Sequence, residues 1–382
     1  MQGAIRREVG NRVDAIASAD SYLSWAASGK INQATIVADS VGFARYTEAA
    51  IAAGDLKALA EKVSKKLFAL TTMARDQSLE KLQRNLVNTL IVRTMYQQNV
   101  VDKLIKQEVT STESESWTNV LRHYWEDGVK VRCGDKELDY GYEYSGSGQM
   151  LVVTQLSEDC FLHHIKNFCE GRGVAAYGPA GTGKTETVKD CAKLIGVPCF
   201  VVNEGGDLKV KFHIVDTNAW VCFDEFNRLS AEDVKIAQEV MYSGKGSFFT
   251  YNPGYEGRTD VSGVPLAGIE MFYPPYGLIN EAHLYFEGIH EGEKLGATLV
   301  AIAEECNEKL SNKDLWSKTP LRQLKAIVVA TGALTRKYGD DLDDTASMFN
   351  ILRKLAGIAE EDTVIYAAIV NKHFPDSKVF DE

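Results

Sequence analysis

Eight consecutive residues, Gly-Pro-Ala-Gly-Thr-Gly-Lys-Thr at positions 178–185, restrict the possible folds of this chain more than any other feature. They match the pattern GxxxxGK[ST], in which glycines let the backbone turn its N–H groups inward around phosphate oxygens. The lysine of such a loop supplies a point charge for the β- and γ-phosphates of a nucleotide, and the final hydroxyl can bind Mg²⁺. The pattern predicts a phosphate-binding loop between a strand and a helix.

The residues on both sides of this loop agree with that prediction. The apolar run 173–177 is typical of a buried strand, and residues 185–195 are typical of a helix that Gly196 and Pro198 would stop. Bound phosphates would then sit at a helix N-terminus, which favours anions. The predicted nucleotide-binding residues are Gly178, Pro179, Ala180, Gly181, Thr182, Gly183, Lys184, Thr185 and Glu186.

Two carboxylates follow a second apolar run. Residues 219–223 are Ala-Trp-Val-Cys-Phe, and Asp224 and Glu225 come directly after them. Asp224 would hold Mg²⁺ through its water shell, together with the hydroxyl of Thr185, and Glu225 would orient or deprotonate an attacking water. The second carboxylate indicates hydrolysis and not binding alone. The alternative is a strand end that carries two solvated acids.

Two further polar residues are candidates for contact with the γ-phosphate. Asn252 follows the strand-like run 247–251, and a polar side chain at that strand tip could touch both the phosphate and the water. Arg322 comes after Thr319-Pro320, a helix N-cap followed by proline at the first helical position. The alternatives are a simple Asn-Pro-Gly turn and a surface arginine.

The pattern of apolar residues divides the chain into three parts, which we expect to be a helical segment at 1–125, an α/β core at 126–285 and a helical lid at 286–382. Residues 20–110 have the three-and-four spacing of helices, and 117–125 continue as a short aromatic helix. Beyond Gly128 the sequence becomes strand-like, and beyond residue 170 short apolar runs alternate with helical segments, which indicates a parallel sheet. The expected sheet strands are 174–177, 199–203, 219–223, 248–251 and 270–273.

Composition excludes some classes of function. The formal net charge of −11 argues against nucleic acid as the main partner, because phosphate backbones need a basic surface. Seven scattered cysteines without a CxxC pair indicate reduced, mostly buried thiols. The chain shows no signal peptide and no apolar run approaching the roughly 18–20 residues that span a membrane. We therefore expect a soluble intracellular protein, with neither nucleic acid nor membrane as a partner.

Several longer stretches are specific enough to indicate a family. GPAGTGKTETVKD, AWVCFDEFNRL, NPGYEGRTD, PPYGLINE and LRQLKAIVVATGALTRKYG resemble the first AAA+ module of a dynein heavy chain, and NTLIVRTMYQQNVVDKLI resembles the end of the linker that precedes it. The resemblance covers roughly residues 20–382. It implies an AAA+ P-loop NTPase core, a five-stranded parallel sheet with flanking helices, with a helical lid and an N-terminal helical linker segment. ATP and Mg²⁺ are the implied cofactors.

The resemblance also assigns roles by position. Lys184 and Thr185 take the Walker A positions, Asp224 and Glu225 the Walker B positions, Asn252 that of sensor 1 and Arg322 that of sensor 2, while Val153 and Leu156 would line the adenine pocket. The family places six such modules in one ring and moves along microtubules. The implied partners are the other AAA+ modules, microtubules through regions absent here, and intermediate and light chains of the parent motor. The implied location is the cytoplasm and cytoskeleton, with a ciliary or flagellar axoneme as one possibility.

The chain departs from the family in three respects. Only residues 229–251 separate FDEFNR from NPGYEGR, where the family carries a longer segment with a hairpin insert that meets the linker. Ala267 occupies the position of the arginine finger, which would serve a neighbouring site. The chain also holds one module, so a fragment, a truncated product and a divergent paralogue are all open.

Three functions remain open at this point. The first is a motor ATPase module that couples ATP turnover to linker movement. The second is a nucleotide-binding structural or regulatory fragment with little turnover. The third is an unrelated AAA+ remodeller or helicase, against which the FDEFNR and NPGYEGR stretches argue.

Overall fold

The computed structural model describes residues 1–16, 21–146, 150–203, 219–243, 246–254, 259, 263–311, 320–338 and 360–374. The chain forms two compact units. One joins Met1–Val63 with Tyr96–Pro274, and the other joins Ser64–Met95 with Pro275–Glu382. The three parts expected from the sequence, 1–125, 126–285 and 286–382, stay a prediction. None of the described helices is both long and apolar enough to cross a bilayer.

The N-terminal part is helical, as its apolar spacing predicts. Its helices are α1 (Gln2–Ile16), α2 (Tyr22–Ala27), α3 (Asn32–Ala53), α4 (Leu56–Ala74) and α5 (Lys81–Lys106). The spacing also identifies the inward faces, since Leu59, Val63 and Leu70 of α4 are buried. Between α3 and α5, the buried Asp39 carboxylate accepts hydrogen bonds from Gln97 Nε2 and the Tyr22 hydroxyl, both at 2.9 Å.

The expected helix at 117–125 is wrong for most of its length. Only α6 (Glu115–Thr118) is helical, and the aromatic residues that follow form the edge of a small antiparallel sheet of β1 (Arg122–Trp125), β2 (Val129–Cys133) and β3 (Lys136–Asp139). Aromatic side chains favour strands when they can pack on one face. The turn at Gly128, with φ +133°, lets the chain reverse and pair.

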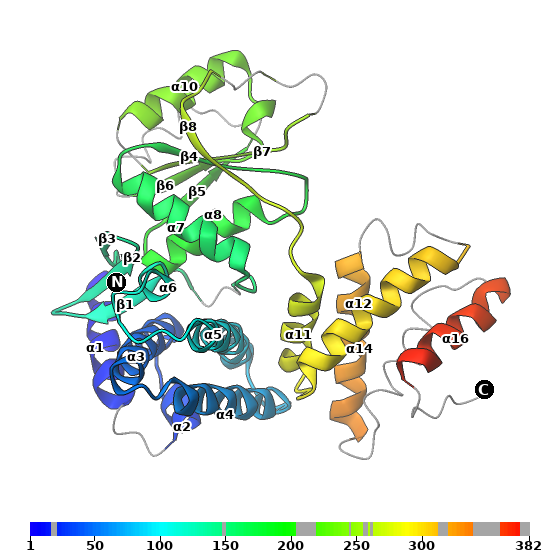
Figure 1. The fold of residues 1–382 in the computed structure, drawn as a ribbon. Helices are drawn as coiled ribbons and strands as arrows, with labels where there is room; N and C mark the ends of the chain where they lie inside the picture. Colours follow the sequence, from blue (N-terminus) through cyan, green and yellow to red (C-terminus); the bar gives the residue numbers. More distant parts are fainter. Residues whose placement is uncertain are drawn as a thin grey trace. The chain divides into compact units, whose positions relative to one another are not determined.

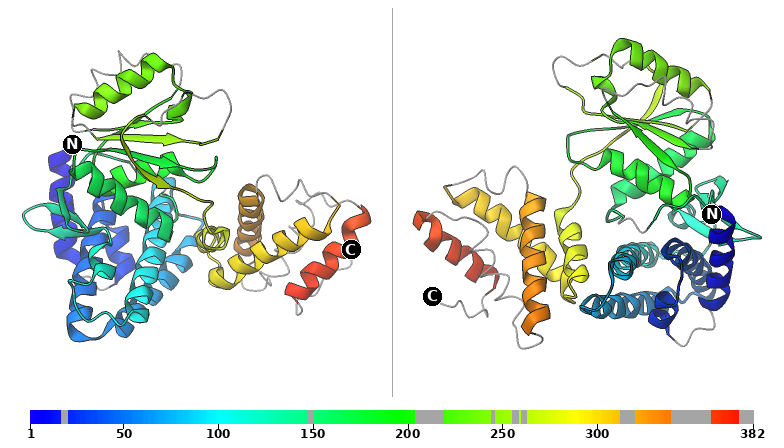
Figure 2. Two further views of the ribbon diagram at one scale, coloured as in Figure 1. Left: turned by 45° about the horizontal axis from the view of Figure 1, so that its top comes forward. Right: turned by 180° about the vertical axis from the view of Figure 1, so that it is seen from behind.

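The α/β core is a five-stranded sheet in which every pair of neighbours is parallel. Its strands are β4 (Gly173–Tyr177), β5 (Cys199–Val202), β6 (Trp220–Phe223), β7 (Ser247–Tyr251) and β8 (Leu266–Glu270), in the order β5-β6-β7-β4-β8. Helix α10 (Ala231–Tyr242) covers one face, and α7 (Gln155–Cys169) and α8 (Lys184–Ile195) cover the other (Figures 1 and 2). The predicted fold class is confirmed.

Both faces of this sheet carry apolar packing. On the α10 side, Val234, Ala237 and Val240 pack in one cluster with Phe223 and Phe249. On the α7 side, the ring of His164 stacks on Phe248 at 5.4 Å between centroids, and Trp220 stacks on Phe248 at 4.1 Å. All seven cysteines are unpaired and five of them are buried, as their spacing predicts.

The fifth strand lies earlier than the sequence predicts. We expected it at 270–273, where aromatic residues gather, but β8 ends at Glu270, and Phe272 and Tyr273 are exposed. Within β8, Gly268 leaves room for the ring of Tyr177. A Cβ at Gly268 would be 3.0 Å from Tyr177 Cε1. Strand propensity alone therefore misplaces β8, because its position also depends on packing against the Tyr177 side chain of β4.

The stretch between the two sheets is also not as expected. Its residues have a strand-like composition, but residues 141–146 and 150–154 form no strand. Thr154 instead begins α7 with a capping box, in which its hydroxyl accepts from the Ser157 N–H and the Ser157 hydroxyl accepts from the Thr154 N–H. The cap fixes where the helix starts.

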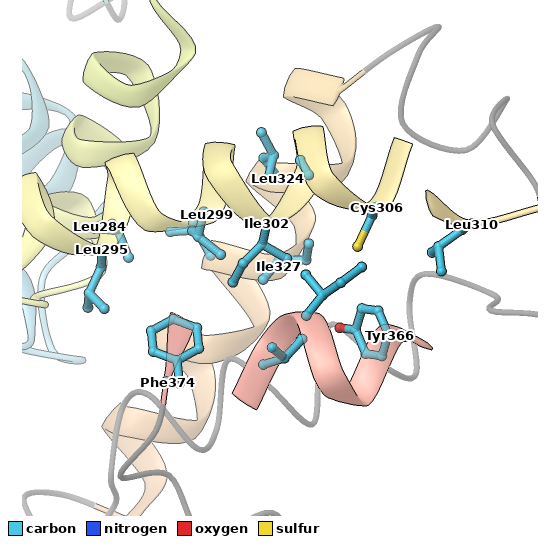
Figure 3. Close-up of a cluster of buried hydrophobic side chains, with 14 of the residues drawn as sticks. Leu284, Leu295, Leu299, Ile302, Cys306, Leu310, Leu324, Ile327, Tyr366 and Phe374 are labelled. Atoms are coloured by element: carbon cyan, nitrogen blue, oxygen red, sulfur yellow. The ribbon is translucent and has the colours of Figure 1, made fainter. Parts of the chain in front are cut away.

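The second unit contains α12 (Gly292–Lys309), α14 (Pro320–Tyr338) and α16 (Thr363–His373), which lie within the expected lid at 286–382. It also contains α11 (Tyr276–Phe286), which almost entirely precedes that range but packs with these helices. Its core gathers Leu299, Ile302, Ile327 and Tyr366 from three of these helices (Figure 3).

The end of α4 belongs to the same unit as these lid helices. The Phe68 ring stacks on His290 at 4.0 Å between centroids. Arg75 Nε donates to the carbonyl oxygen of Gly288 at 2.6 Å. This part of the N-terminal helical segment is thus tied directly to the turn between α11 and α12.

Candidate nucleotide site

The phosphate-binding loop connects β4 to α8 at the carboxyl edge of the sheet. Gly178 has φ +148°, and a Cβ there would overlap the carbonyl oxygen of Met271, so only glycine fits. The Gly178 N–H donates to the Tyr251 carbonyl at 3.2 Å, and the Met271 N–H donates to the Tyr177 carbonyl at 2.7 Å. The start of the loop is therefore anchored at the carboxyl ends of both neighbouring strands.

This position is a topological switch point. Strand β4 lies between β7 and β8, while the chain leaving it through α8 crosses to β5 at the far edge. Ligands of open α/β sheets bind in the crevice that such a reversal opens at the carboxyl ends of the strands.

Lys184 is buried and turned toward the loop that precedes it. Its Nζ donates to the carbonyl oxygens of Gly178 and Pro179 at 3.0 and 2.6 Å, and lies 3.4 Å from Thr182 Oγ1. Burial lowers the pKa of Lys184 from its ordinary value, while Asp224 and Glu225 act in the opposite direction. Phosphate oxygens are stronger acceptors for an ammonium than carbonyls, so a bound nucleotide would take over these hydrogen bonds.

Three oxygen-bearing side chains from three elements meet beside the loop. The hydroxyls of Thr185 on α8 and Thr250 on β7 each donate to Asp224 Oδ1, which follows β6, and both distances are 2.5 Å. The two hydroxyl oxygens are 3.5 Å apart. Hydroxyl and carboxylate oxygens suit Mg²⁺, which takes one or two protein ligands beside substrate phosphates. The predicted metal ligands Thr185 and Asp224 thus lie together, and the residues fit the ion.

Glu225 has an unusual backbone conformation. Its φ of +49° and ψ of +45° are left-handed, which is uncommon for a residue with a side chain and occurs at functional sites. Its N–H donates to Thr250 Oγ1 at 3.3 Å. Its Oε2 lies 2.5 Å from Arg228 Nε, at the end of the short helix η2 (Phe226–Arg228). To act on a water molecule, the Glu225 carboxylate would have to leave Arg228 and form a hydrogen bond with that water instead.

Asn252 lies directly after β7, the strand beside β4, as predicted. Its carbonyl oxygen accepts a hydrogen bond from Asn227 Nδ2 at 2.8 Å, which ties the strand tip to η2. Its assignment as the γ-phosphate sensor stays a prediction. Arg322 lies in the first turn of α14, as expected, but its side chain falls outside the described residues. Its role also stays a prediction.

The residues expected to contact the base lie just before and within α7. Val153 is buried, and Leu156 packs against a cluster of Cys160 on α7, Ala176 near the end of β4 and Met271 directly after β8. Their contact with adenine stays a prediction.

The segment that carries these two residues is fixed to the phosphate-loop helix. The N–H of Leu151 donates to Asp190 Oδ2 at 2.7 Å, and Lys193 Nζ donates to Asp190 Oδ1 at 2.8 Å. Leu151 Cδ1 would lie 3.6 Å from a Cβ at Gly183, so this exposed leucine borders the loop.

Sequence patterns missed three residues of this site, namely Leu151, Asp190 and Thr250. Thr250 offers the one usable signal, because it is a hydroxyl side chain inside the otherwise aromatic run Phe248, Phe249 and Tyr251. Asp190 has no such signal, because in the sequence it is an ordinary polar residue of a helix, and only the structure shows its contact with Leu151.

Comparison with known proteins agrees with this geometry. The family described as hydrolytic ATP binding site of dynein motor region matches residues 140–243 and 237–382. Dynein axonemal heavy chain 6 of Homo sapiens is 32% identical over 357 residues, covering 84% of this chain and 8% of that protein. Dynein axonemal heavy chain 1 of Mus musculus is 31% identical over 382 residues, covering 91% and 9%. Dynein axonemal heavy chain 9 of Homo sapiens is 32% identical over 378 residues, covering 88% and 8%.

These relatives are far longer than the chain, which spans less than a tenth of their length. The family match covers the sheet, the phosphate-binding loop and the lid together. The chain belongs to the dynein motor family, as its hydrolytic ATP-binding AAA+ module.

Proposed function

We propose that this module binds Mg²⁺·ATP at the switch point of its sheet and cleaves the γ-phosphate with water. One observation carries the proposal. The Thr185 hydroxyl, at the start of α8, and the Asp224 carboxylate, at the end of β6, are 2.5 Å apart beside the buried ammonium of Lys184. A cation-binding pair next to a phosphate-binding lysine is the arrangement that nucleoside triphosphate hydrolysis requires.

Binding would rest on residues 178–186. The left-handed glycines at 181 and 183 let the loop backbone present N–H groups to the phosphates, and the N-terminus of α8 adds its dipole. Lys184 would move its hydrogen bonds from the loop carbonyls to the β- and γ-phosphates. Val153 and Leu156 would contact the base.

Hydrolysis would depend on Glu225. Its carboxylate would take a proton from water and orient it toward the γ-phosphate, a contribution of roughly 10²–10⁴ in rate for a positioned base. Asp224 and Thr185 would hold Mg²⁺, which neutralises charge on the β- and γ-phosphate oxygens when bound. Asn252 and Arg322 would sense the γ-phosphate and report its loss to the lid.

The parent protein would be a microtubule motor, and the relatives that match are named as axonemal dynein heavy chains. We infer a location in the cytoskeleton of a cilium or flagellum. Coupling to the linker is supported within the second compact unit, where the end of α4 contacts the lid through Arg75 and Phe68. Other ring modules, microtubules, and intermediate and light chains would act through regions outside these 382 residues.

A second candidate function, nucleotide binding with little turnover, is favoured by one observation. Ala267, at the position of the arginine finger, lies within β8 in register with Val174 of β4. A methyl group in a sheet strand cannot stabilise charge on a phosphate in a neighbouring module. A second copy of this chain would carry Ala267 as well, so copies could not supply an arginine to each other's sites, and the isolated chain would bind ATP with little turnover.

Calorimetric titration with Mg²⁺·ATP tests binding. Lys184→Ala should abolish measurable affinity, because it removes the cation that faces the β- and γ-phosphates. Lys166→Ala is the matched control, since Lys166 is an exposed lysine of α7 in the same compact unit. Equal affinity of Lys184→Ala and the unsubstituted chain would show that the loop is not the phosphate site.

A further inference from the structure

Thr250 lies inside a strand, is 1% exposed, and has no role in the patterns that identify this family's ATP site from sequence. Its hydroxyl nevertheless contacts the metal-binding carboxylate, the metal-binding hydroxyl and the backbone of the general base. We propose that Thr250 is a positioning residue for the metal and the attacking water, acting through Asp224 and Glu225. The proposal rests on the function given above and adds a residue to it.

The register of the sheet explains why this side chain reaches all three groups. Phe249 of β7 pairs with Phe223 of β6, so Thr250 is level with Asp224, the next residue along. On the other side Thr250 pairs with Ala176 of β4, one residue before the end of the strand that leads into the phosphate loop. Thr250 is thus the residue of β7 that stands level with Asp224, two residues short of the loop on β4.

The hydrogen bonds around Thr250 assign it one donor and one acceptor role. Its proton goes to Asp224 Oδ1 at 2.5 Å, and its oxygen accepts the Glu225 N–H at 3.3 Å. Thr185 also donates to Oδ1. Two hydroxyl donors therefore share Asp224 Oδ1, and in our proposal Oδ2 would be the oxygen that binds a metal ion or its water.

The Thr250 hydroxyl oxygen, as the acceptor of the Glu225 N–H, acts on the left-handed backbone of Glu225. A residue with a side chain holds this conformation only where its surroundings enforce it. The hydrogen bond from its N–H to a buried hydroxyl is such a restraint, and it sets the point from which the Glu225 side chain extends. Loss of the hydroxyl would thus disturb the base and the metal ligand together.

Two substitutions separate the hydroxyl from the shape of the side chain. Thr250→Val keeps the branched shape and removes the donor and acceptor, whereas Thr250→Ser keeps the hydroxyl and removes a methyl group. Thr47→Val is the matched control, because Thr47 is a fully buried threonine of α3 in the same compact unit that bonds a helix carbonyl at 2.8 Å.

The measurement is binding of Mn²⁺, followed by electron paramagnetic resonance, to the 382-residue chain saturated with the slowly hydrolysed analogue ATPγS. Thr250→Val should weaken Mn²⁺ binding by roughly 10–100-fold, the usual effect of removing a group that orients a metal ligand. Thr250→Ser and Thr47→Val should stay close to the unsubstituted chain. Equal Mn²⁺ affinity in Thr250→Val would overturn the proposal.

Two controls keep the result interpretable. Nucleotide affinity in excess EDTA reports on the loop alone. If the unsubstituted chain binds no nucleotide, the proposed function fails, whereas unchanged Mn²⁺ affinity in a variant that binds nucleotide refutes only the role of Thr250. If Thr250→Val does not fold, Thr250→Cys replaces it, because a thiol is a weak donor of similar size. Unweakened Mn²⁺ binding in Thr250→Cys would equally contradict the proposal.

Discussion

Asp190 shows how a single side chain can connect the phosphate loop to a second part of the site. It is buried on α8, and burial raises the pKa of its carboxyl, although Lys193 and the Leu151 N–H act in the opposite direction. Through that N–H it holds the segment that leads to Val153 and Leu156. If these two residues line the adenine pocket, Asp190 controls base binding while contributing nothing to the phosphates directly.

We therefore expect Asp190→Ala to weaken ATP binding by about tenfold, equivalent to about 1.4 kcal/mol, and to weaken tripolyphosphate binding much less. Competition titration against a fluorescent ATP analogue measures both ligands on the same variant. Glu158→Ala, another buried acid of this unit that lies on α7, is the control. Equal losses for ATP and tripolyphosphate would show that Asp190 supports the loop and not the base.

At the same scale, the residues that the sequence identified and those it missed differ in one physical respect. Lys184, Thr185, Asp224 and Glu225 stand within short contiguous patterns whose chemistry is local. Thr250 acquires its contacts from the register of three parallel strands, and no spacing along the chain encodes that register. Single-sequence reasoning therefore finds the groups proposed to contact the nucleotide more easily than the groups that hold those side chains in place.

At the scale of elements, periodicity predicted the helices and four strands well because their inward faces are apolar. It misplaced β8, whose Gly268 makes room for the ring of Tyr177. It also assigned residues 117–125 to a helix, where the aromatic side chains pair across an antiparallel turn. In both cases tertiary packing outweighed local preference.

The contact between α11 and α12 leads to a prediction on pH. A Cβ at Gly296 of α12 would lie 2.9 Å from the Glu281 backbone nitrogen on α11, so the two helices approach closely. Burial and the nearby Glu293 raise the pKa of Glu281 to about 7, against a weaker opposite effect of a hydrogen bond with Tyr285. The folded lid thus holds this proton more tightly than the unfolded chain does.

Stability from the protonated Glu281 carboxyl is fully present below its unfolded pKa and is lost as the pH rises through the folded value. Burial also lowers the pKa of His283 to about 4, which makes stability rise with pH over part of the same range. The difference in stability between the unsubstituted chain and Glu281→Gln isolates the contribution of the Glu281 carboxyl, because both proteins contain His283.

The melting temperatures of Glu281→Gln and the unsubstituted chain should be similar near about pH 5, and the variant should gain an increasing advantage up to about pH 7. Above that pH the difference should stay constant. Thermal unfolding monitored by circular dichroism across this range is the measurement. A difference that does not change with pH would show that Glu281 is ionised in the folded lid.

At the scale of the whole molecule, the proposed site would contain its own base and metal ligands, but an arginine supplied by a neighbour contributes about 10³–10⁵ in rate to related reactions. Residues 1–382 contain one GxxxxGK[ST] loop, and Ala267 stands where the family resemblance would place an arginine finger. We expect a preparation of these residues to bind ATP and to hydrolyse it slowly, with a long-lived ATP state. Turnover at several per second without another chain would contradict this expectation and would indicate an arginine within the module that acts on its own site.

The central claim is that this site cleaves the nucleotide it binds and that Glu225 is the base. Single-turnover conversion of radiolabelled Mg²⁺·ATP, with the chain in excess, tests it most directly, because slow chemistry is still resolved over a long time course. The unsubstituted chain should convert bound ATP to ADP, and Glu225→Gln should bind ATP equally well but convert it at least ~100-fold more slowly. Conversion of ATP at the same rate in both proteins would show that Glu225 is only a solvated acid at the end of β6.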